Sequence, residues 1–208
     1  MQDTCVARIA PEDEHLQAIV HDAAAKGFPA IAISAADGQV LQFLVRSCHA
    51  RRAVEIGTLA GYSGLWIARS LVAGGKLDTF ELDPARAAFA REHIAAGKPQ
   101  ADVTVHEGPA LENLGRIDGE VDFVFIDADK GNYPNYVAWA MGKVRIGGII
   151  ALDNAFAWGG LADPTKLGER AHEAVAMRDA IDRLVKDGRF TVAMIPTNEG
   201  LAVAVRNA

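Results

Sequence analysis

The strongest constraint on the fold is an alternation along the chain between short apolar runs rich in Val, Ile and Phe and longer stretches with helical spacing. This alternation is typical of βαβ units, in which each helix returns the chain to begin the next parallel strand. The expected strands are Arg52–Gly57, Lys76–Leu82, Asp102–Glu107, Val121–Asp127, Gly148–Asp153, Phe190–Pro196 and Leu201–Arg206. The expected helices are Glu12–Lys26, Asp37–Ala50, Tyr62–Ala73, Pro84–Ala96, Tyr133–Val144 and Glu169–Lys186. We therefore predict an α/β fold with helices on both faces of a seven-stranded sheet.

The connection between the last two strands makes this prediction more specific. Only four residues, Thr197–Gly200, join them. A parallel crossover needs a dozen or more residues, so these two strands must form an antiparallel hairpin. The sheet is therefore expected to be parallel except for a strand of this C-terminal hairpin.

Charge and length exclude several classes of protein. The 208 residues include 21 Lys and Arg against 27 Asp and Glu, a formal net charge of −6. This balance argues against a nucleic-acid partner, because such proteins neutralise phosphates with clustered Lys and Arg. With no run of about 18 apolar residues and no leader pattern, we expect a cytoplasmic protein without a membrane partner. The length suits a single domain over residues 1–208, and Cys5 and Cys48 are expected to be buried or incidental thiols.

A glycine-rich turn follows the first expected strand. Residues 55–64 read EIGTLAGYSG, and a helix is expected to follow. Glycines at this place let a ligand approach the backbone near a helix N-terminus. The dinucleotide pattern G-x-G-x-x-G is not met, because Leu59 stands where its second glycine should be. The spacing is E-x-G-x-x-x-G instead.

Acidic residues near this turn are candidates for ligand contacts. Glu81, at the end of the second strand, is expected to accept hydrogen bonds from two ribose hydroxyls. Asp83 is the alternative, although an Asp before Pro84 is also a good helix N-cap. Glu55 lies in a strand that should be buried, where an unpaired carboxylate is costly unless a cationic ligand offsets it. S-adenosylmethionine has an amine and a sulfonium, whereas NAD has neither near that position.

Oxygen-bearing side chains end two further strands. Asp127 follows the fourth expected strand, and Asp153 and Asn154 end the fifth. The carboxyl ends of parallel strands meet at one edge of a sheet, so these side chains are expected to lie together. Three oxygen ligands without His or Cys favour a hard cation, Mg²⁺ before Ca²⁺ or Mn²⁺. The alternative is that Asp127 caps a helix and that Asp153 and Asn154 form a turn.

Two further side chains are candidates for contact with a substrate. Lys130 lies three residues after Asp127 and is a candidate base. Trp158 follows the proposed metal ligands in a Gly- and Pro-rich loop, and it would either stack on an aromatic substrate or pack against its own loop.

Three stretches make the chain resemble the cation-dependent O-methyltransferases of the caffeoyl-CoA and catechol type. They are residues 55–64, residues 123–133 (FVFIDADKGNY) and residues 147–154 (GGIIALDN). The middle stretch is the most specific, because D-A-D-K-x-N-Y is close to a signature of that family. The resemblance implies a Rossmann-like S-adenosylmethionine-dependent methyltransferase fold, Mg²⁺ as the working cation, a homodimer, and a small phenolic substrate with two adjacent oxygens.

The resemblance also assigns roles to individual residues. It implies that Lys130 is the general base that faces the substrate and that Asp127 serves both cofactor and metal. The residues expected to bind the cofactor are Ile33, Glu55, Gly57, Thr58, Ser63, Glu81, Leu82, Pro109, Ala110, Asp127 and Asp129. The expected metal ligands are Asp127, Asp153 and Asn154.

Two other functions stay open at this point. One is a module that binds S-adenosylmethionine without catalysis, which the intact set of Asp127, Asp153, Asn154 and Lys130 disfavours. The other is a nicotinamide-dependent oxidoreductase. The strands and helices use nearly the whole chain, so loops, the N-terminal helices within residues 1–50 or a second subunit must form the substrate pocket.

Overall fold

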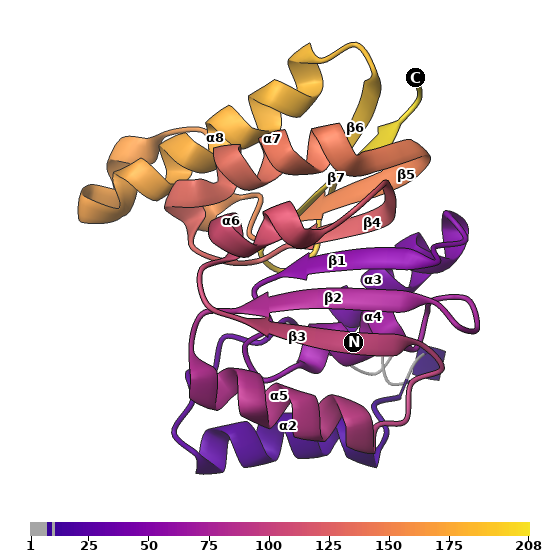
Figure 1. The fold of residues 1–208 in the computed structure, drawn as a ribbon. Helices are drawn as coiled ribbons and strands as arrows, with labels where there is room; N and C mark the ends of the chain where they lie inside the picture. The colour runs from indigo at the N-terminus through magenta and orange to yellow at the C-terminus, as the bar shows by residue number, and fades with distance from the viewer. Residues whose placement is uncertain (1–7, 10) are drawn as a thin grey trace.

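A computed structural model, which describes residues 8–9 and 11–208, contains one seven-stranded sheet. The strands are β1 (Arg52–Ile56), β2 (Lys76–Glu81), β3 (Asp102–Glu107), β4 (Val121–Ile126), β5 (Val144–Leu152), β6 (Phe190–Ile195) and β7 (Leu201–Arg206). Their spatial order is β3-β2-β1-β4-β5-β7-β6 (Figure 1). All pairs are parallel except those of β7, which runs antiparallel to both β5 and β6. The predicted mostly parallel sheet with its C-terminal hairpin is therefore confirmed.

Helices cover both faces of this sheet. They are α2 (Glu14–Ala25), α3 (Ala35–Ser47), α4 (Tyr62–Ala68), α5 (Pro84–Ala96), α6 (Ala110–Asn113), α7 (Tyr133–Lys143) and α8 (Ala171–Lys186). Alternate residues of a strand point to opposite faces. Val54 and Val124 accordingly belong to the apolar cluster under α7 and α8, whereas Ala53 and Phe123 belong to the cluster under α3 and α4. Figure 1 shows α7 and α8 in front of the sheet and α3 and α4 behind it.

Two predicted boundaries were wrong by several residues, and one short helix was not predicted. The helix expected over Tyr62–Ala73 ends at Ala68, because the chain turns away and the Val72 N–H donates to the Ala50 carbonyl. Strand β5 begins at Val144 rather than Gly148. The glycine pair Gly147–Gly148 interrupts the apolar pattern in the sequence, but the strand continues through it with an irregular register against β4. Helix α6 was not predicted, because four residues are too short for a periodic pattern.

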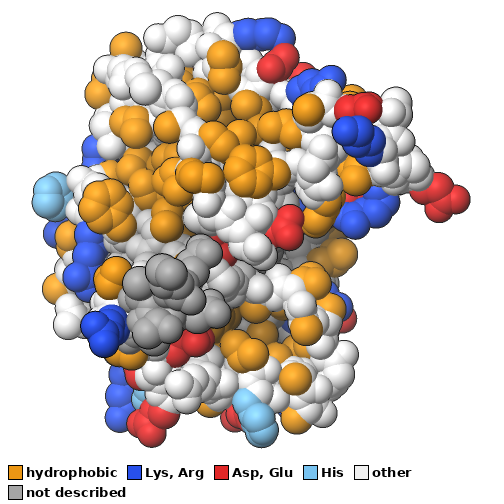
Figure 2. Space-filling view, turned by 180° about the vertical axis from the view of Figure 1, so that it is seen from behind, with side chains coloured by type: hydrophobic (Ala, Val, Ile, Leu, Met, Phe, Trp, Pro, Cys, Tyr) orange, Lys and Arg blue, Asp and Glu red, His pale blue; other side chains and the backbone are white. Residues whose placement is uncertain are grey.

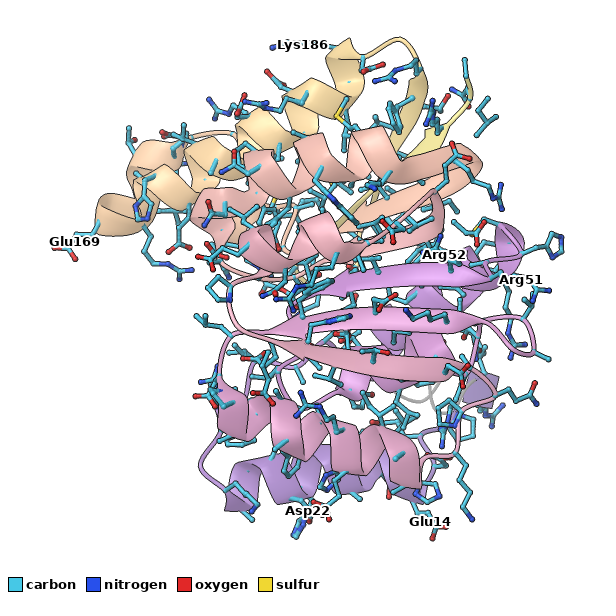
Figure 3. The ribbon with its side chains drawn as sticks, in the orientation of Figure 1. Glu14, Asp22, Arg51, Arg52, Glu169 and Lys186 are labelled. Carbon is cyan, nitrogen blue, oxygen red and sulfur yellow. The ribbon has the colours of Figure 1, made fainter. Side chains whose placement is uncertain are left out.

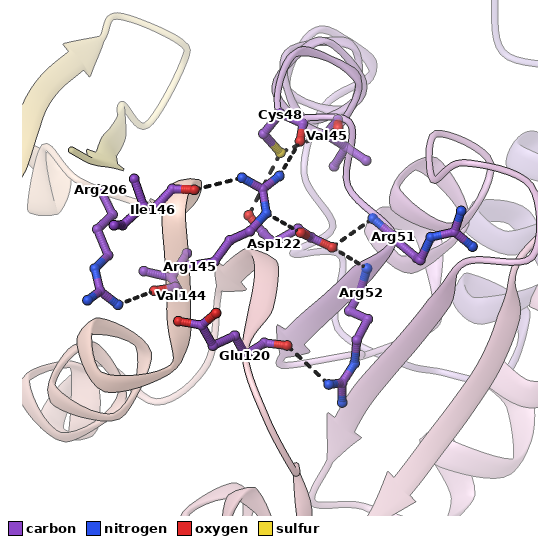
Figure 4. A network of polar contacts seen from close by, with 10 residues as sticks. All are labelled: Val45, Cys48, Arg51, Arg52, Glu120, Asp122, Val144, Arg145, Ile146 and Arg206. Atoms are coloured by element: carbon purple, nitrogen blue, oxygen red, sulfur yellow. Dashed lines mark hydrogen bonds and ion pairs between the residues drawn. The ribbon is translucent and has the colours of Figure 1, made fainter. Parts of the chain in front are cut away.

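The amino-terminal edge of the sheet is held by a network of buried and half-buried polar groups (Figure 4). Asp122 accepts hydrogen bonds from the main-chain N–H groups of Arg51 and Arg52, at 2.8 and 2.7 Å, and it pairs with Arg145. Arg145 also donates to the Cys48 carbonyl at 2.6 Å. Burial alone would raise the pKa of Asp122, but these donors lower it below its usual value. The network therefore fastens β1, β4 and β5 together at their amino-terminal ends, away from the carboxyl ends of the strands.

Basic residues of the sequence gather at this same edge. Figure 3 shows Arg51 and Arg52 at the end of the sheet opposite Glu169, which precedes α8 near the carboxyl ends of the strands.

Cys48 is a buried thiol, and burial raises its pKa to about 11, whereas Cys5 lies outside the described residues. In the described part of the chain, no helix is both long and apolar enough to cross a membrane.

Candidate active site

The carboxyl ends of the parallel strands open into a cavity of about 1210 Å³. Every predicted site residue except Glu55 lines it. Those residues are Ile33, Gly57, Thr58, Ser63, Glu81, Leu82, Pro109, Ala110, Asp127, Asp129, Lys130, Asp153, Asn154 and Trp158. Strand ends far apart in the sequence thus contribute to one hollow, as the parallel topology requires.

The glycine turn after β1 is shaped by contact with β4. Gly57 has φ +101°, and a Cβ built there would lie 1.9 Å from the Asp127 carbonyl oxygen. The Gly57 and Thr58 N–H groups both donate to the Phe80 carbonyl, at 3.0 and 3.1 Å. The end of the neighbouring strand β4 therefore requires glycine at this position. From the sequence, this glycine was expected only to make room for a ligand.

Glu81 and Asp83, the two alternatives near the end of β2, have different surroundings. Asp83 caps α5, because its carboxylate accepts hydrogen bonds from the N–H groups of Ala85 and Arg86. The Glu81 carboxylate lies at the cavity and accepts from the N–H groups of Leu59 (2.8 Å) and Asp83 (3.0 Å). These main-chain donors fix the Glu81 side chain in place, and its carboxylate oxygens keep lone pairs that can accept further hydrogen bonds. Asp83 is thus occupied by its helix, and Glu81 remains available.

Glu55 is the exception among the predicted cofactor contacts. It is fully buried and does not line the cavity, and its carboxylate accepts hydrogen bonds from Ser63 Oγ (2.5 Å) and Thr79 Oγ1 (2.6 Å). Burial raises its pKa to about 7, against the opposing effect of the two hydroxyls. The premise that Glu55 is an unpaired carboxylate was therefore wrong, because two hydroxyl donors accompany it, and its contact with the cofactor remains a prediction. In this structure Glu55 supports Ser63, which does line the cavity.

Asp127, Asp153 and Asn154 lie together at the ends of β4 and β5. The strands pair Ile126 with Leu152, so Asp127 and Asp153 follow at adjacent places, and the Asp153 N–H donates to the Ile126 carbonyl at 3.0 Å. Burial and the negative charge of Asp127 together raise the pKa of Asp153 to about 7. Asn154, the next residue, lines the same cavity, and two carboxylates in mutual repulsion together with an amide are a donor set that a hard divalent cation would stabilise. Within the described residues, no group of three or more His, Cys, Asp or Glu is arranged to hold a metal, and this set supplies two carboxylates and one amide.

Lys130 lies against one of these carboxylates, that of Asp127. Its Nζ donates to Asp127 Oδ1 at 2.8 Å and to the Tyr133 hydroxyl at 2.7 Å. A short 3₁₀ turn, Lys130–Asn132, brings it there, and its side chain is only 10% exposed. The amine is thus held beside the predicted metal ligands with part of its surface facing the cavity.

Tyr133 is the last residue of the motif at residues 123–133, and the sequence alone predicted no role for it. Tyr133 is fully buried, and its hydroxyl donates to the Ile126 carbonyl at 3.1 Å. Burial, together with the charges of Asp127 and Asp153, raises its pKa well above the usual value. Tyr133 therefore keeps its proton. The sequence signal for its contact with Lys130 was the spacing of three residues between them.

Asp129 lines the cavity but is already engaged by two neighbours. Its carboxylate accepts hydrogen bonds from the Tyr136 hydroxyl, at 2.6 Å, and from the Asn132 side-chain amide. These contacts fix its orientation beside the predicted cofactor site, and contact with a ligand remains a prediction.

Trp158 reaches the cavity from the loop after β5. The guanidinium of Arg170 lies over its ring, 3.8 Å from the ring centre, and Arg170 also pairs with Glu173 at 2.8 Å. One face of the indole is therefore covered by a cation. Arg170, His172 and Glu173 all line the cavity, and sequence reasoning missed them because only the folded loop brings them there.

The segment before α3 forms another wall. Residues 30–34 line the cavity, and so does the buried Asp37, whose carboxylate accepts hydrogen bonds from the Ser34 N–H and hydroxyl in a capping box. The N-terminal part of the chain thus helps to close the site, one of the alternatives that the sequence left open. Asp37 was not predicted as a lining residue.

Comparisons with known proteins show the family to which this chain is similar. The family described as O-methyltransferase matches residues 6–207. The catechol O-methyltransferase of Niastella koreensis is 34% identical over 204 residues, 93% of this chain and 90% of that protein. The O-methyltransferase from Bacillus cereus in complex with SAH has a TM-score of 0.91 at 32% identity, covering 99% of this chain and 96% of that one. The O-methyltransferase TomG from Streptomyces achromogenes, involved in Tomaymycin synthesis and in complex with SAM, has a TM-score of 0.87 at 31% identity, covering 95% and 91%.

These likenesses extend over nearly the whole chain, and they confirm both the predicted methyltransferase fold and the predicted family resemblance. The chain belongs to the O-methyltransferase family.

Proposed function

We propose that this protein transfers a methyl group from S-adenosylmethionine to one of two adjacent oxygens on a small catechol-like phenol, with the help of a divalent cation. The observation that carries the proposal is the meeting of Glu81, the Asp127–Asp153–Asn154 set and Lys130 in one cavity. Each of these groups suits one part of the reaction. Their meeting at a single sheet edge is what a methyl transfer between two bound molecules needs.

The charge of the cavity suits the cofactor. Seven lining residues are acidic (Asp37, Glu81, Asp127, Asp129, Asp153, Glu173 and Glu199) and three are Lys or Arg (Arg86, Lys130 and Arg170). S-adenosylmethionine carries a sulfonium and an ammonium, which such a surface attracts. Glu81 would hold the ribose hydroxyls, and the turn at Gly57 and Ser63 would lie against the methionine part. The SAM and SAH complexes of the related enzymes support this choice.

The donor set at the ends of β4 and β5 fits a hard cation, with Mg²⁺ preferred over Ca²⁺ or Mn²⁺. Asp127, Asp153 and Asn154 would hold it through oxygen atoms alone. When bound, the cation would favour the ionised form of a phenol. The catechol O-methyltransferase among the relatives supports a substrate with two adjacent oxygens.

The chain's own residues then position the reactants and handle the proton. Lys130 Nζ, which faces the cavity beside Asp127, would take the proton that the phenol gives up as its oxygen becomes methylated. Trp158, with one face already covered by Arg170, would border the aromatic ring. Catalysis would thus depend mainly on orientation and electrostatics.

Two other functions have less support. A nicotinamide-dependent oxidoreductase is disfavoured by the family and by the missing second glycine of the dinucleotide pattern, where Leu59 stands. A binding module without catalysis does not explain why Lys130 is held beside Asp127 at the wall of the cavity. A cytoplasmic location stays a prediction.

The test is a methyl-transfer assay with S-adenosylmethionine and simple catechols, run with Mg²⁺, with excess EDTA, and with Mg²⁺ restored. We expect methylated catechol with Mg²⁺, background rates in EDTA, and recovery on adding the metal. A parallel titration would show binding of S-adenosylmethionine and none of NAD. Cofactor binding without turnover on any catechol would favour the non-catalytic module, and full activity in EDTA would exclude the metal.

We also propose that two copies of the chain pair through the face behind the sheet. Figure 2 shows apolar side chains gathered over the upper part of this face with few charged ones among them. Phe43, on α3, is 70% exposed, and Val40, Ile195 and Val205 are partly buried around the cluster that α3 covers. An apolar surface fits a second copy of itself across a two-fold axis, because no opposite charge is needed.

Replacing Phe43 with glutamate is expected to convert this dimer into a monomer, because it places two carboxylates in an apolar contact. Light scattering of the purified protein would give the mass of one chain instead of two. Val185→Glu is the matched control, since Val185 is 60% exposed on α8, on the other face of the sheet. If wild type is already monomeric at assay concentrations, the dimer proposal fails.

A further inference from the structure

Glu55 is a buried carboxylate that the proposed reaction does not use. Its side chain is fully buried and does not line the cavity. Helix α4 covers it closely, because a Cβ built on Gly64 would lie 2.9 Å from Glu55 Oε2. A carboxylate in such a place is costly unless hydrogen bonds offset the loss of water. In this structure it can act on a bound molecule only through neighbours that do line the cavity.

Two hydroxyl groups supply the hydrogen bonds of Glu55. Ser63 Oγ donates to Oε1 at 2.5 Å, and Thr79 Oγ1, from the paired position of β2, donates to Oε2 at 2.6 Å. An ionised carboxylate only accepts, and a hydroxyl has one proton to donate. Both hydroxyls therefore direct their single proton at Glu55. Thr58 Oγ1 lies 2.5 Å from Thr79 Oγ1 and must be the donor of that pair.

Ser63 connects this network to the cavity. It follows the glycine turn in the first helical turn of α4 (Tyr62–Ala68), and it lines the cavity. Because its proton points at Glu55, only the lone pairs of its oxygen are left for a bound molecule. Ser63 thus offers the cavity an acceptor and no donor. Such a group selects a ligand that carries donors of its own, and an ammonium most strongly.

We propose that Glu55 is a positioning residue that keeps the Ser63 proton turned inward, so that the Ser63 oxygen accepts a hydrogen bond from the ammonium of the cofactor. This inference rests on the proposed function, because it takes S-adenosylmethionine as the ligand. Among the donors of that molecule, the ribose hydroxyls are expected at Glu81. The ammonium is the donor that the negative charge behind Ser63 also attracts.

The test compares the binding of S-adenosylhomocysteine with that of its desamino analogue, in which hydrogen replaces the ammonium. Glu55→Gln keeps the shape of the side chain, but an amide must also donate. The amide nitrogen could face Thr79 instead of Ser63, and adding Thr79→Val removes that choice, because a methyl group cannot accept. The amide then donates to Ser63 and turns the Ser63 proton toward the cavity.

Calorimetry at about pH 8, above the pKa of about 7 to which burial raises Glu55, measures the effect. In the double variant Glu55→Gln, Thr79→Val, we expect the dissociation constant of S-adenosylhomocysteine to rise roughly tenfold, as for a lost hydrogen bond to a charged group. That of the desamino analogue should change less than about twofold. Equal weakening of both ligands would indicate a structural defect and would overturn the proposal.

Two controls separate positioning from packing and from charge. Thr79→Val alone keeps the hydrogen bond between Ser63 and Glu55, and we expect it to treat the two ligands alike. In a Ser63→Ala background, adding the double variant should cause no further loss that is specific to S-adenosylhomocysteine. A further loss of about tenfold there would mean that the charge of Glu55 acts through space, not through Ser63.

A measurement on the wild-type protein decides the matter if the double variant does not fold. The Ser63 hydroxyl proton, held by a carboxylate, is expected as a downfield NMR resonance that is absent in Ser63→Ala and persists in the complex with S-adenosylhomocysteine. Loss of this resonance on binding would contradict the inference, because the proton would then have turned away from Glu55. Failure of wild type to bind S-adenosylhomocysteine would count against the proposed function instead.

Discussion

Replacing Asp153 with alanine is expected to lower Mg²⁺-stimulated methyl transfer at least about a thousandfold, because a cation acting on a developing charge contributes several kcal/mol. Asp153 ends β5 next to Asp127, and burial with that neighbouring charge raises its pKa to about 7. The variant keeps the glycine turn and Glu81. Binding of S-adenosylmethionine, measured by calorimetry, should therefore change little.

Stability measurements distinguish this loss from misfolding. In the absence of metal, the raised pKa means that the folded protein binds a proton at Asp153 more tightly than the unfolded chain does. Its contribution to stability is then present at low pH and is lost as the pH rises through about 7. Above that pH, removing the carboxylate removes repulsion from Asp127, so the melting temperature of Asp153→Ala should equal or exceed that of wild type.

Asp83→Ala is the matched control, because Asp83 also follows a strand end but caps α5. It should lower the free energy of unfolding by about 1 kcal/mol and leave the response to Mg²⁺ intact. Mg²⁺ stimulation that survives in Asp153→Ala would place the metal elsewhere.

The fold was predictable because its two decisive features are local in the sequence. Apolar periodicity marks each strand, and the four residues 197–200 force β7 to run antiparallel. Boundaries were less accurate where main-chain contacts between distant segments decide them. The end of α4, where Val72 pairs with Ala50, is one such place.

The candidate site was predictable to the extent that strand ends determine it. Asp127, Asp153 and Asn154 meet because parallel strands end at one edge. The partners of Glu55 were not predictable, because Thr79, one of its hydroxyl donors, comes from another strand and no local sequence pattern indicates that pairing. Arg170 was missed for a similar reason, since it reaches Trp158 only once the loop has folded.

Gly57→Ala is the second prediction with a large effect, and it tests the turn between the proposed cofactor site and the proposed metal site. A methyl group at this position would lie 1.9 Å from the Asp127 carbonyl oxygen, and φ is +101°, a conformation that side chains rarely adopt. The backbone cannot yield easily, because Gly57 N–H and Asp127 N–H donate to Phe80 and Ile56 across the sheet. We expect a loss of roughly 3 kcal/mol or more in the free energy of unfolding, a fall of about 10 °C in the melting temperature.

The matched control is Gly142→Ala, in α7, where a Cβ would meet nothing within 4 Å and φ is not positive. It should leave the melting temperature unchanged or raise it slightly, since alanine favours the helix by up to about 1 kcal/mol. Because the turn also sets the position of Asp127, Gly57→Ala should weaken S-adenosylmethionine binding and the Mg²⁺ response together, whereas Asp153→Ala separates them. Melting of Gly57→Ala within 2 °C or so of wild type would mean that the β1 turn and the end of β4 are not packed in this way.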